Sequence, residues 1–262
     1  MRVNGLPATA EDLAPLALYG YGSFTSLVVD VGRVQGLDLH MERLQHDAEF
    51  LFSARIDEAR VRRWLREATT HSIGPVSARI TLFQRAFSMS RPADGPPDVL
   101  ITTRPNPTAS PAAIRVATTV FVRDAPEVKH TGLFAQLHRR RTAQDRGFDD
   151  ILFVDTHDHV SEGATWNIAF ATADGRIRWP RADVLPGVTM RLLQAALPRQ
   201  GFAVDSAPVH RSDLPDFSHA FATNAVAGIR SITAIDDQRF ALNAELEESL
   251  RACWTSVPAQ EL

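Results

Sequence analysis

The hydrophobic and polar positions of this chain follow two different periods, and each period predicts one kind of secondary structure. Runs rich in Val, Ile, Phe and Thr that are bounded by Gly or Pro are typical of strands. Apolar residues that recur three and four positions apart are typical of helices. We therefore expect strands at residues 23–31, 76–83, 99–103, 114–122, 151–155, 166–172 and 220–223, and helices at residues 39–52, 57–70, 133–145, 187–197 and 242–254.

The order of these elements is neither a simple strand–helix alternation nor all-strand, so it predicts an α+β protein. A Pro-rich stretch at residues 104–112 separates two halves of the chain. Prolines restrict their neighbours and cannot donate hydrogen bonds to a sheet, so this stretch is expected to be a connection. We expect a small N-terminal α/β domain at residues 1–105, an interdomain linker at 106–112 and a larger C-terminal domain at 113–262.

Composition narrows the class of protein. With 44% apolar residues, 23% charged residues and a net charge of −3, the chain is typical of soluble globular proteins and lacks the basic stripe of a nucleic-acid binder. The basic cluster at residues 138–141 is expected on a solvated helix face. No apolar run approaches the roughly 20 residues that cross a bilayer. One cysteine and a start without signal-peptide features predict a cytoplasmic protein with no membrane partner.

Lysine occurs once, at Lys129, among 28 lysine and arginine residues. Because arginine stands almost everywhere else, the remaining lysine is expected where arginine does not serve. Covalent attack on a carbonyl group is such a role. It requires an unprotonated amine, and the guanidinium of arginine stays protonated. A solvated surface lysine that was kept by chance is the alternative.

Other segments carry groups that suit an anionic or heterocyclic ligand. Glu162 is either a turn residue or a carboxylate that keeps a heterocyclic nitrogen protonated. Gly187 opens a predicted helix, whose first amides and the Thr189 hydroxyl predict an anion site. The small, polar segment at residues 222–228 has the same character. Arg43, near the start of another helix, is either a phosphate ligand or a surface residue.

Together these segments resemble the fold-type IV pyridoxal-phosphate enzymes, also called class IV aminotransferases. The family includes branched-chain aminotransferases, D-amino acid aminotransferases and aminodeoxychorismate lyase. The resemblance covers about residues 19–235 and rests on the order and spacing of its motifs. These are Tyr-Gly-Ser-Phe-Thr at 21–25, His-Met-Glu-Arg-Leu at 40–44, Lys129, Glu-Gly-Ala-Thr-Trp-Asn at 162–167, Leu-Pro-Gly-Val-Thr at 185–189 and Thr-Asn-Ala at 223–225.

The resemblance implies an enzyme with two domains, the larger of which has a β-barrel-like core. It implies that the cofactor is pyridoxal 5'-phosphate, that the catalytic residue Lys129 bonds to it, and that Glu162 faces its pyridine nitrogen. It also implies transfer of an amino group between an amino acid or amine and a 2-oxo acid, in a homodimer that uses no metal. The other cofactor-binding residues that it implies are Arg43, Asn167, Val188, Thr189, Thr223 and Asn224.

Two alternatives stay open. An aminodeoxychorismate lyase-like enzyme would use the same residues to release pyruvate, and a protein of this fold with little turnover would only bind the cofactor. Several relatives place Asn-Tyr four and five positions after the lysine, where this chain has Leu133 and Phe134. Branched-chain enzymes place a Tyr at about Ser77. These departures argue against a branched-chain assignment, and the sequence names no amino donor.

Overall fold

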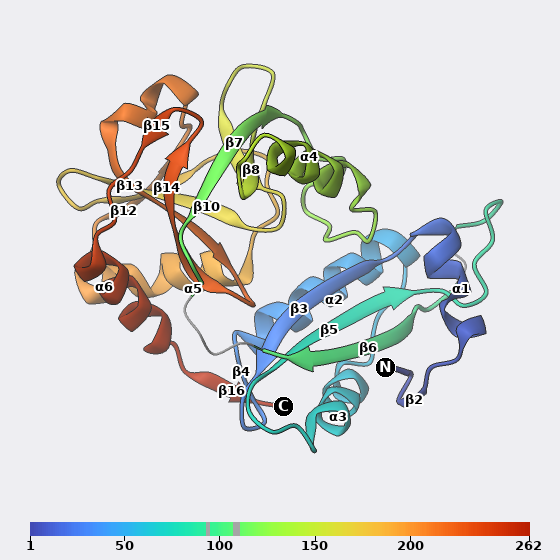
Figure 1. The fold of residues 1–262 in the computed structure, drawn as a ribbon. Coiled ribbons are helices and arrows are strands. Elements are labelled where there is room, and N and C mark those ends of the chain that lie inside the picture. The colour runs from blue at the N-terminus through green and yellow to red at the C-terminus, as the bar shows by residue number, and fades with distance from the viewer. Residues whose placement is uncertain (93–94, 107–110) are drawn as a thin grey trace. The chain divides into compact units, whose positions relative to one another are not determined.

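The protein is described by a computed structural model that covers residues 1–92, 95–106 and 111–262 (Figure 1). The chain folds into two compact units. The N-terminal unit comprises Met1–Thr108, Val128–Leu133 and Pro258–Leu262, and the barrel unit comprises Ala109–Glu127 and Phe134–Val257. Residues 107–110 of the predicted linker lie outside the described residues, and the domain boundaries at 105 and 113 stay a prediction.

The N-terminal unit is built on an antiparallel sheet with the strand order β2-β1-β6-β5-β3. Helices α2 and α3 pack on one face of this sheet, where they share an apolar core with β3, β5 and β6. The elements are β1 (Arg2–Val3), β2 (Leu6–Pro7), α1 (Ala10–Tyr19), β3 (Ser23–Val29), β4 (Arg33–Gln35), α2 (Leu37–Phe52), α3 (Glu58–Thr69), β5 (Val76–Phe83), β6 (Asp98–Pro105) and β16 (Ala259–Glu261), which pairs with β4.

Alternation along β5 separates the two faces of this sheet. Ala78, Ile80 and Leu82 belong to the apolar core that the helices cover. Successive side chains of a strand point to opposite faces, so Ser77 and Arg79 lie on the other face. That second face is therefore polar and cationic at Ser77 and Arg79, whereas Phe83 at the end of the strand packs with Val3 and Leu100 in a second apolar cluster.

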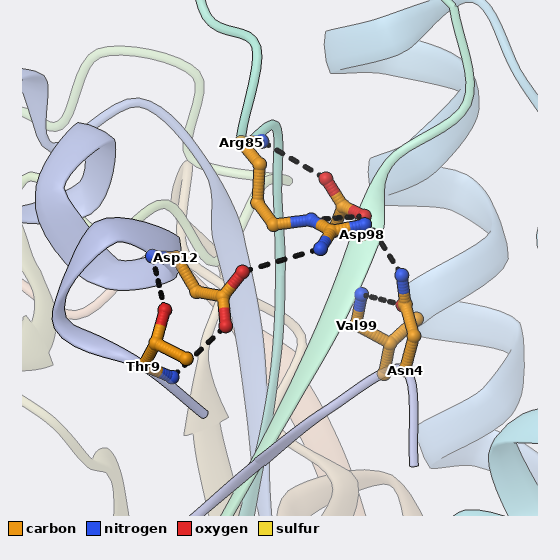
Figure 2. Close-up of polar contacts among 6 residues, drawn as sticks. All are labelled: Asn4, Thr9, Asp12, Arg85, Asp98 and Val99. Carbon is orange, nitrogen blue, oxygen red and sulfur yellow. Dashed lines mark hydrogen bonds and ion pairs between the residues drawn. The ribbon is translucent and has the colours of Figure 1, made fainter. Parts of the chain in front are cut away.

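A polar network attaches the first strands and α1 to the ends of β5 and β6 (Figure 2). The Arg85 guanidinium donates to Asp12 at 3.2 Å and to Asp98 at 3.0 Å. Asn4 donates to Asp98 at 2.8 Å and accepts from the Val99 amide at 2.9 Å. The carboxylate of Asp12 also accepts from the backbone of Thr9, at the start of α1, and this bond is the main reason why the pKa of Asp12 is lowered.

The barrel unit closes a sheet on itself. Its strands run in the order β10-β13-β14-β7-β8-β9, and β9 pairs back onto β10 where Glu162 lies opposite Asn167. The elements are β7 (Ile114–Val120), α4 (Phe134–Asp145), β8 (Asp150–Val154), β9 (Val160–Gly163), β10 (Asn167–Thr172), β11 (Ile177–Pro180), α5 (Val188–Ala196), η1 (Leu197–Gln200), β12 (Val204–Ala207), η2 (Arg211–Asp216), β13 (Phe217–Asn224), β14 (Gly228–Ile235), β15 (Gln238–Arg239) and α6 (Ala244–Thr255).

Both faces of the barrel sheet are covered by apolar side chains. Ile168 and Phe170 pack in a cluster to which the strands around the ring contribute, and this cluster fills the interior. Ala169 and Ala171, on the opposite face of the same strand, pack against α5 and α6. Small residues on the outer face let the helices approach the sheet closely, and Met190 and Leu193 of α5 pack there.

The predicted fold class is confirmed, and each predicted helix and strand is present within a few residues. The predictions missed α1 and several strands, among them β9 and β14, which complete the barrel. The prediction for the basic cluster is wrong for Arg140. Only 23% of this side chain is exposed, because it bonds to Asp150 and Thr165 at 2.8 Å each. Within the described residues, no helix is long and apolar enough to cross a membrane.

Candidate active site

Lys129 lies in the connection between β7 and α4, but it is β3 that fixes this segment. The Lys129 carbonyl accepts a hydrogen bond from the Phe24 amide at 2.9 Å, and the Thr131 amide donates to the Gly22 carbonyl at 2.8 Å. The Thr131 hydroxyl donates to the carbonyl of Gly20 as well. The lysine is thus attached to an edge strand of the N-terminal unit, rather than being anchored directly by β7.

The side chain of Lys129 lies beside an aromatic ring and a buried helix face. Its Nζ is 5.0 Å from the centroid of the Phe24 ring. Its backbone N–H donates to Oδ2 of Asp47, on α2, at 3.3 Å. His40, one turn before Arg43 on the same helix, is buried and hydrogen-bonded to Thr25 at 2.6 Å. Burial, followed by the charges of Arg43 and Lys129, lowers the pKa of His40 to about 3, so its ring is neutral at pH 7.

Glu162 lies in the barrel unit and is almost fully buried. Its carboxylate is 3.3 Å from Nη1 of Arg123 and accepts from the Leu185 amide at 3.3 Å. A buried charge needs a partner and hydrogen bonds, and here both are present. The ion pair and the hydrogen bond therefore fix the position of the Glu162 carboxylate, so Glu162 is not a simple turn residue.

Asn167 braces the loop that leads into α5. Its amide donates to the Leu185 carbonyl at 2.8 Å and to Glu162 at 3.5 Å. A Cβ at Gly187 would overlap the side-chain oxygen of Asn167, so only glycine fits at that position. The predicted cofactor residue Asn167 thus makes its hydrogen bonds to the protein, and positions both Glu162 and the start of α5.

Helix α5 begins with Gly187 as its N-cap and has no side-chain capping bond. The first amides of a helix lack partners within the helix and attract anions. Thr189, in the first turn, is 1% exposed, and its hydroxyl has no hydrogen-bond partner among the described residues. A buried hydroxyl without a partner is costly, so this helix start is suited to a ligand with acceptor oxygens, such as a phosphate.

Thr223 and Asn224 end β13 next to these residues. Thr223 lies opposite Asn167 on the neighbouring strand and donates to its carbonyl at 3.4 Å. Asn224 accepts from the amides of Val226 and Ala227 at 3.0 and 2.7 Å, and so closes the turn to β14. Both were predicted to bind the cofactor, and those roles stay predictions, whereas the hydrogen bonds of Asn224 give it a structural task in the turn.

The sequence model of the amino-transferase class IV family matches residues 22–235, which is most of the chain. The chain belongs to the class IV aminotransferase family. A probable branched-chain-amino-acid aminotransferase of Rickettsia bellii is 30% identical over 98 residues. That alignment covers 37% of this chain, and the chain spans only about a third of that relative's length (34%).

Solved structures show the same class IV fold. The PLP-bound form of a hypothetical aminotransferase from Mycobacterium tuberculosis has a TM-score of 0.80 and 21% identity, and the match covers 97% of this chain and 94% of the other. The branched-chain amino acid aminotransferase of Escherichia coli has a TM-score of 0.82 and 20% identity, with 96% and 89% covered. At these identities the likeness shows the fold. The predicted family is confirmed.

The class IV motifs did not reveal every residue of the candidate site. Asp47 and Arg123 were missed, although both are in contact with motif residues. Asp47 lies between Leu44 and Ala48 of an apolar helix face. An acidic residue at such a position is unusual, so the sequence could have marked Asp47 as a candidate. Arg123 gave no such signal, because it lies in a connection without periodicity.

Proposed function

We propose that this protein is a pyridoxal-phosphate-dependent aminotransferase that exchanges an amino group between an amino acid or amine and a 2-oxo acid. The observation that carries the proposal is the placement of Lys129. It is the chain's one lysine, and both its backbone N–H and its carbonyl are hydrogen-bonded, to Asp47 and Phe24. An amine held in this way suits a reaction that requires a lysine in a constant position.

The residues of the barrel unit fit the cofactor. When bound, pyridoxal phosphate supplies a carbonyl carbon that amines attack and a pyridine ring that withdraws electrons. The buried carboxylate of Glu162 is suited to hold a proton on the ring nitrogen, and Arg123 fixes its orientation. The amides of Val188 and Thr189, with the unpartnered Thr189 hydroxyl, are suited to the phosphate. We assign Arg43, Thr223 and Asn224 to the cofactor as further contacts, by the family motifs.

Lys129 has two tasks in this proposal. Its amine would hold the cofactor covalently. When free, the same amine would take the proton from Cα of the substrate as a general base and would deliver it to C4′ of the cofactor as a general acid. The neutral ring of His40 adds no positive charge beside the amine.

The cationic face of the sheet in the N-terminal unit supports a carboxylate substrate. The Arg79 guanidinium stacks on the Phe24 ring, 3.5 Å from its centroid, and Phe24 is the ring that Lys129 approaches. Burial and the charge of Arg104 lower the pKa of Arg79. Within the described residues, neither arginine has a carboxylate within ion-pair distance, so an anionic substrate would balance their charge.

A purified sample tests the proposal directly. We expect a yellow protein whose visible absorption changes when one class of amino donor is added. Borohydride reduction should remove the yellow colour and make the attachment of the cofactor irreversible. Lys129→Ala should abolish covalent attachment of the cofactor. A protein that takes up no pyridoxal phosphate would refute the proposal. Release of pyruvate without a 2-oxo acid acceptor would favour the lyase, and a bound cofactor without turnover would favour a binding protein.

We also propose that the protein acts as a homodimer. Phe134 and Leu137 on α4 are 80% and 47% exposed, and Val120 and Val122 at the end of β7 are each 54% exposed. Phe134 and Leu137 are three positions apart on α4, so they are neighbours on the helix surface, and a contiguous exposed apolar patch is typical of an association surface. Light scattering should give twice the mass of the chain, and Phe134→Asp with Leu137→Asp should give the monomer mass.

We further propose that the protein works in the cytoplasm. The chain has one cysteine, Cys253, which is free and buried, so it forms no intramolecular disulfide. That pattern is typical of reducing compartments. Cell fractionation followed by detection of the native protein tests this, and recovery outside the cytoplasmic fraction would contradict it.

A further inference from the structure

A tight turn joins Glu162 to Asn167, and the ring of Trp166 packs against the first residue of this turn. Glu162 pairs with Asn167 across β9 and β10. The Gly163 amide donates to the Trp166 carbonyl at 2.8 Å, which closes the turn. A Cβ at Gly163 would overlap the Trp166 ring, so the indole lies directly against the backbone there. The position of this ring therefore limits where the chain next to Glu162 can lie.

Asp150, the first residue of β8, holds this indole. Asp150 is buried, and its Oδ2 accepts from Nε1 of Trp166 at 2.9 Å. Its Oδ1 accepts from Nε of Arg140 and from the Ile151 amide, at 2.8 Å each. Arg140 also donates from Nη2 to the Thr165 hydroxyl at 2.8 Å. Two side chains of the turn, Thr165 and Trp166, are thus bonded to the members of one ion pair.

The ion pair of Asp150 and Arg140 gives the turn a direction rather than additional stability. Their side chains are 11% and 23% exposed. Desolvation offsets much of the attraction in a pair of this kind, so apolar side chains of similar volume often stabilise a fold as well. Hydrogen bonds between charged groups are short and geometrically specific. Here the pair is bonded to the turn on both sides, at Thr165 and at Trp166, and so holds it in one geometry.

We propose that Asp150 is a positioning residue for Glu162, and that its ion pair with Arg140 fixes the turn so that the carboxylate faces the ring nitrogen of the cofactor. The proposal rests on the proposed function, which supplies that partner for Glu162. Within the described residues, one residue pair joins β9 to β10, so β9 depends on further contacts for its position. A hydrogen bond weakens steeply when its angle or length changes, so a small displacement of the turn would weaken the contact with the cofactor.

The Leu185 amide reports the position of Glu162 in the cofactor-free protein, because it donates to that carboxylate at 3.3 Å. Hydrogen exchange followed by NMR measures how firmly this bond is held. Asp150→Asn replaces one acceptor oxygen by a donor group, and we expect it to speed exchange of the Leu185 amide about tenfold. Asp145→Asn removes the same charge from an exposed site on α4 and should leave this exchange rate unchanged.

Exchange elsewhere in the barrel separates positioning from general stability. A general loss of stability would speed exchange of the core amides of β13 and β14 as much as that of Leu185. Such a uniform rise in Asp150→Asn would overturn the proposal, and so would an unchanged Leu185 amide. Arg140→Gln retains the Asp150 carboxylate and should give a smaller rise at Leu185. If Asp150→Asn does not fold, Arg140→Gln decides the question by the same criteria.

The cofactor-bound protein gives a second readout. Asp150→Asn should lower the affinity for pyridoxal phosphate about tenfold. In a protein that already carries Glu162→Gln, the same change should lower it less than about twofold, because two changes that act on one contact do not add. Additive losses would overturn the proposal.

A wild type that never binds pyridoxal phosphate would refute the proposed function. The exchange rate of the Leu185 amide would still decide whether Asp150 positions Glu162, because that measurement needs no cofactor. The two failures are therefore distinguishable.

Discussion

Arg123 and Glu162 form an ion pair across 3.3 Å in the barrel unit, with side chains that are 7% and 5% exposed. Neither residue is near the other in sequence, and the pair depends on the closed barrel to bring them together. Glu162 is further held by the Leu185 amide. Contacts within the protein therefore hold the Glu162 carboxylate in place, independently of any bound cofactor.

Arg123→Gln should reduce both stability and cofactor affinity. Loss of one partner leaves a buried charge uncompensated, which costs about 3–5 kcal/mol in the free energy of unfolding. Urea unfolding and titration with pyridoxal phosphate measure the two effects. The matched control is Arg141→Gln, which removes an exposed pair with Asp145 and should cost less than about 1 kcal/mol. Equal losses in both variants would contradict the assignment.

Thr189→Val should affect the free and cofactor-bound protein in opposite directions. Without a ligand the buried hydroxyl has no partner, so its replacement by a methyl group should leave the free protein as stable or more stable. With the phosphate bound, a hydrogen bond is lost and affinity should fall about tenfold. Thermal unfolding with and without pyridoxal phosphate checks both signs, and Thr189→Ser should bind like the wild type.

His40 should make the N-terminal unit sensitive to acid. Its pKa of about 3 lies below the usual value of 6.5, so between these values the unfolded chain binds a proton that the folded chain does not. The free energy of unfolding should therefore fall as pH decreases from about 6.5 towards 3, by at most about 1.4 kcal/mol per pH unit from this group. It should be unaffected by His40 above pH 7. Urea unfolding of the wild type and of His40→Gln at pH 7 and pH 5 isolates this contribution, which should be absent in the variant.

Arg79→Gln should weaken substrate binding more than turnover. If a substrate carboxylate lies on the cationic sheet face, loss of this guanidinium should raise KM for the 2-oxo acid about tenfold or more, because charged hydrogen bonds contribute about 1.5–3 kcal/mol. Arg63→Gln on α3 is the control, since its side chain is 57% exposed on the helical layer. An unchanged KM in Arg79→Gln would place the substrate carboxylate elsewhere.

Sequence patterns predicted the helices and strands with strong periodicity, and they predicted the motif residues. They did not predict the residues that contact the motif residues and hold them in place. The helix at 39–52 and the strand at 76–83 were predicted within about two residues, because one face of each is apolar. Strand β9 was missed since Val160–Gly163 is short and is defined by its pairing with β8 and β10. Pairing between distant segments is a tertiary property that local patterns do not carry.

Local sequence patterns also failed to predict the contacts between residues of the candidate site. Lys129 and Glu162 were identified by residue type and by motif, whereas Arg123 and Asp47 matter because of what they contact. Asn167 and Asn224 were predicted as cofactor ligands, and the structure adds their hydrogen bonds to the loop before α5 and to the turn after β13. A motif records which residues occur together and does not say which of them hold the others in place.

The barrel closes at the pair formed by Glu162 and Asn167. The junction between β9 and β10 has a single residue pair, fewer than any other junction of the ring, and this pair carries the proposed cofactor anion. Loosening of β9 would move Glu162 while the apolar interior keeps the remaining strands together. Mild destabilisation should thus produce a protein that is folded but has lost its cofactor, so that bound pyridoxal phosphate becomes a natural reporter of whether the ring is closed.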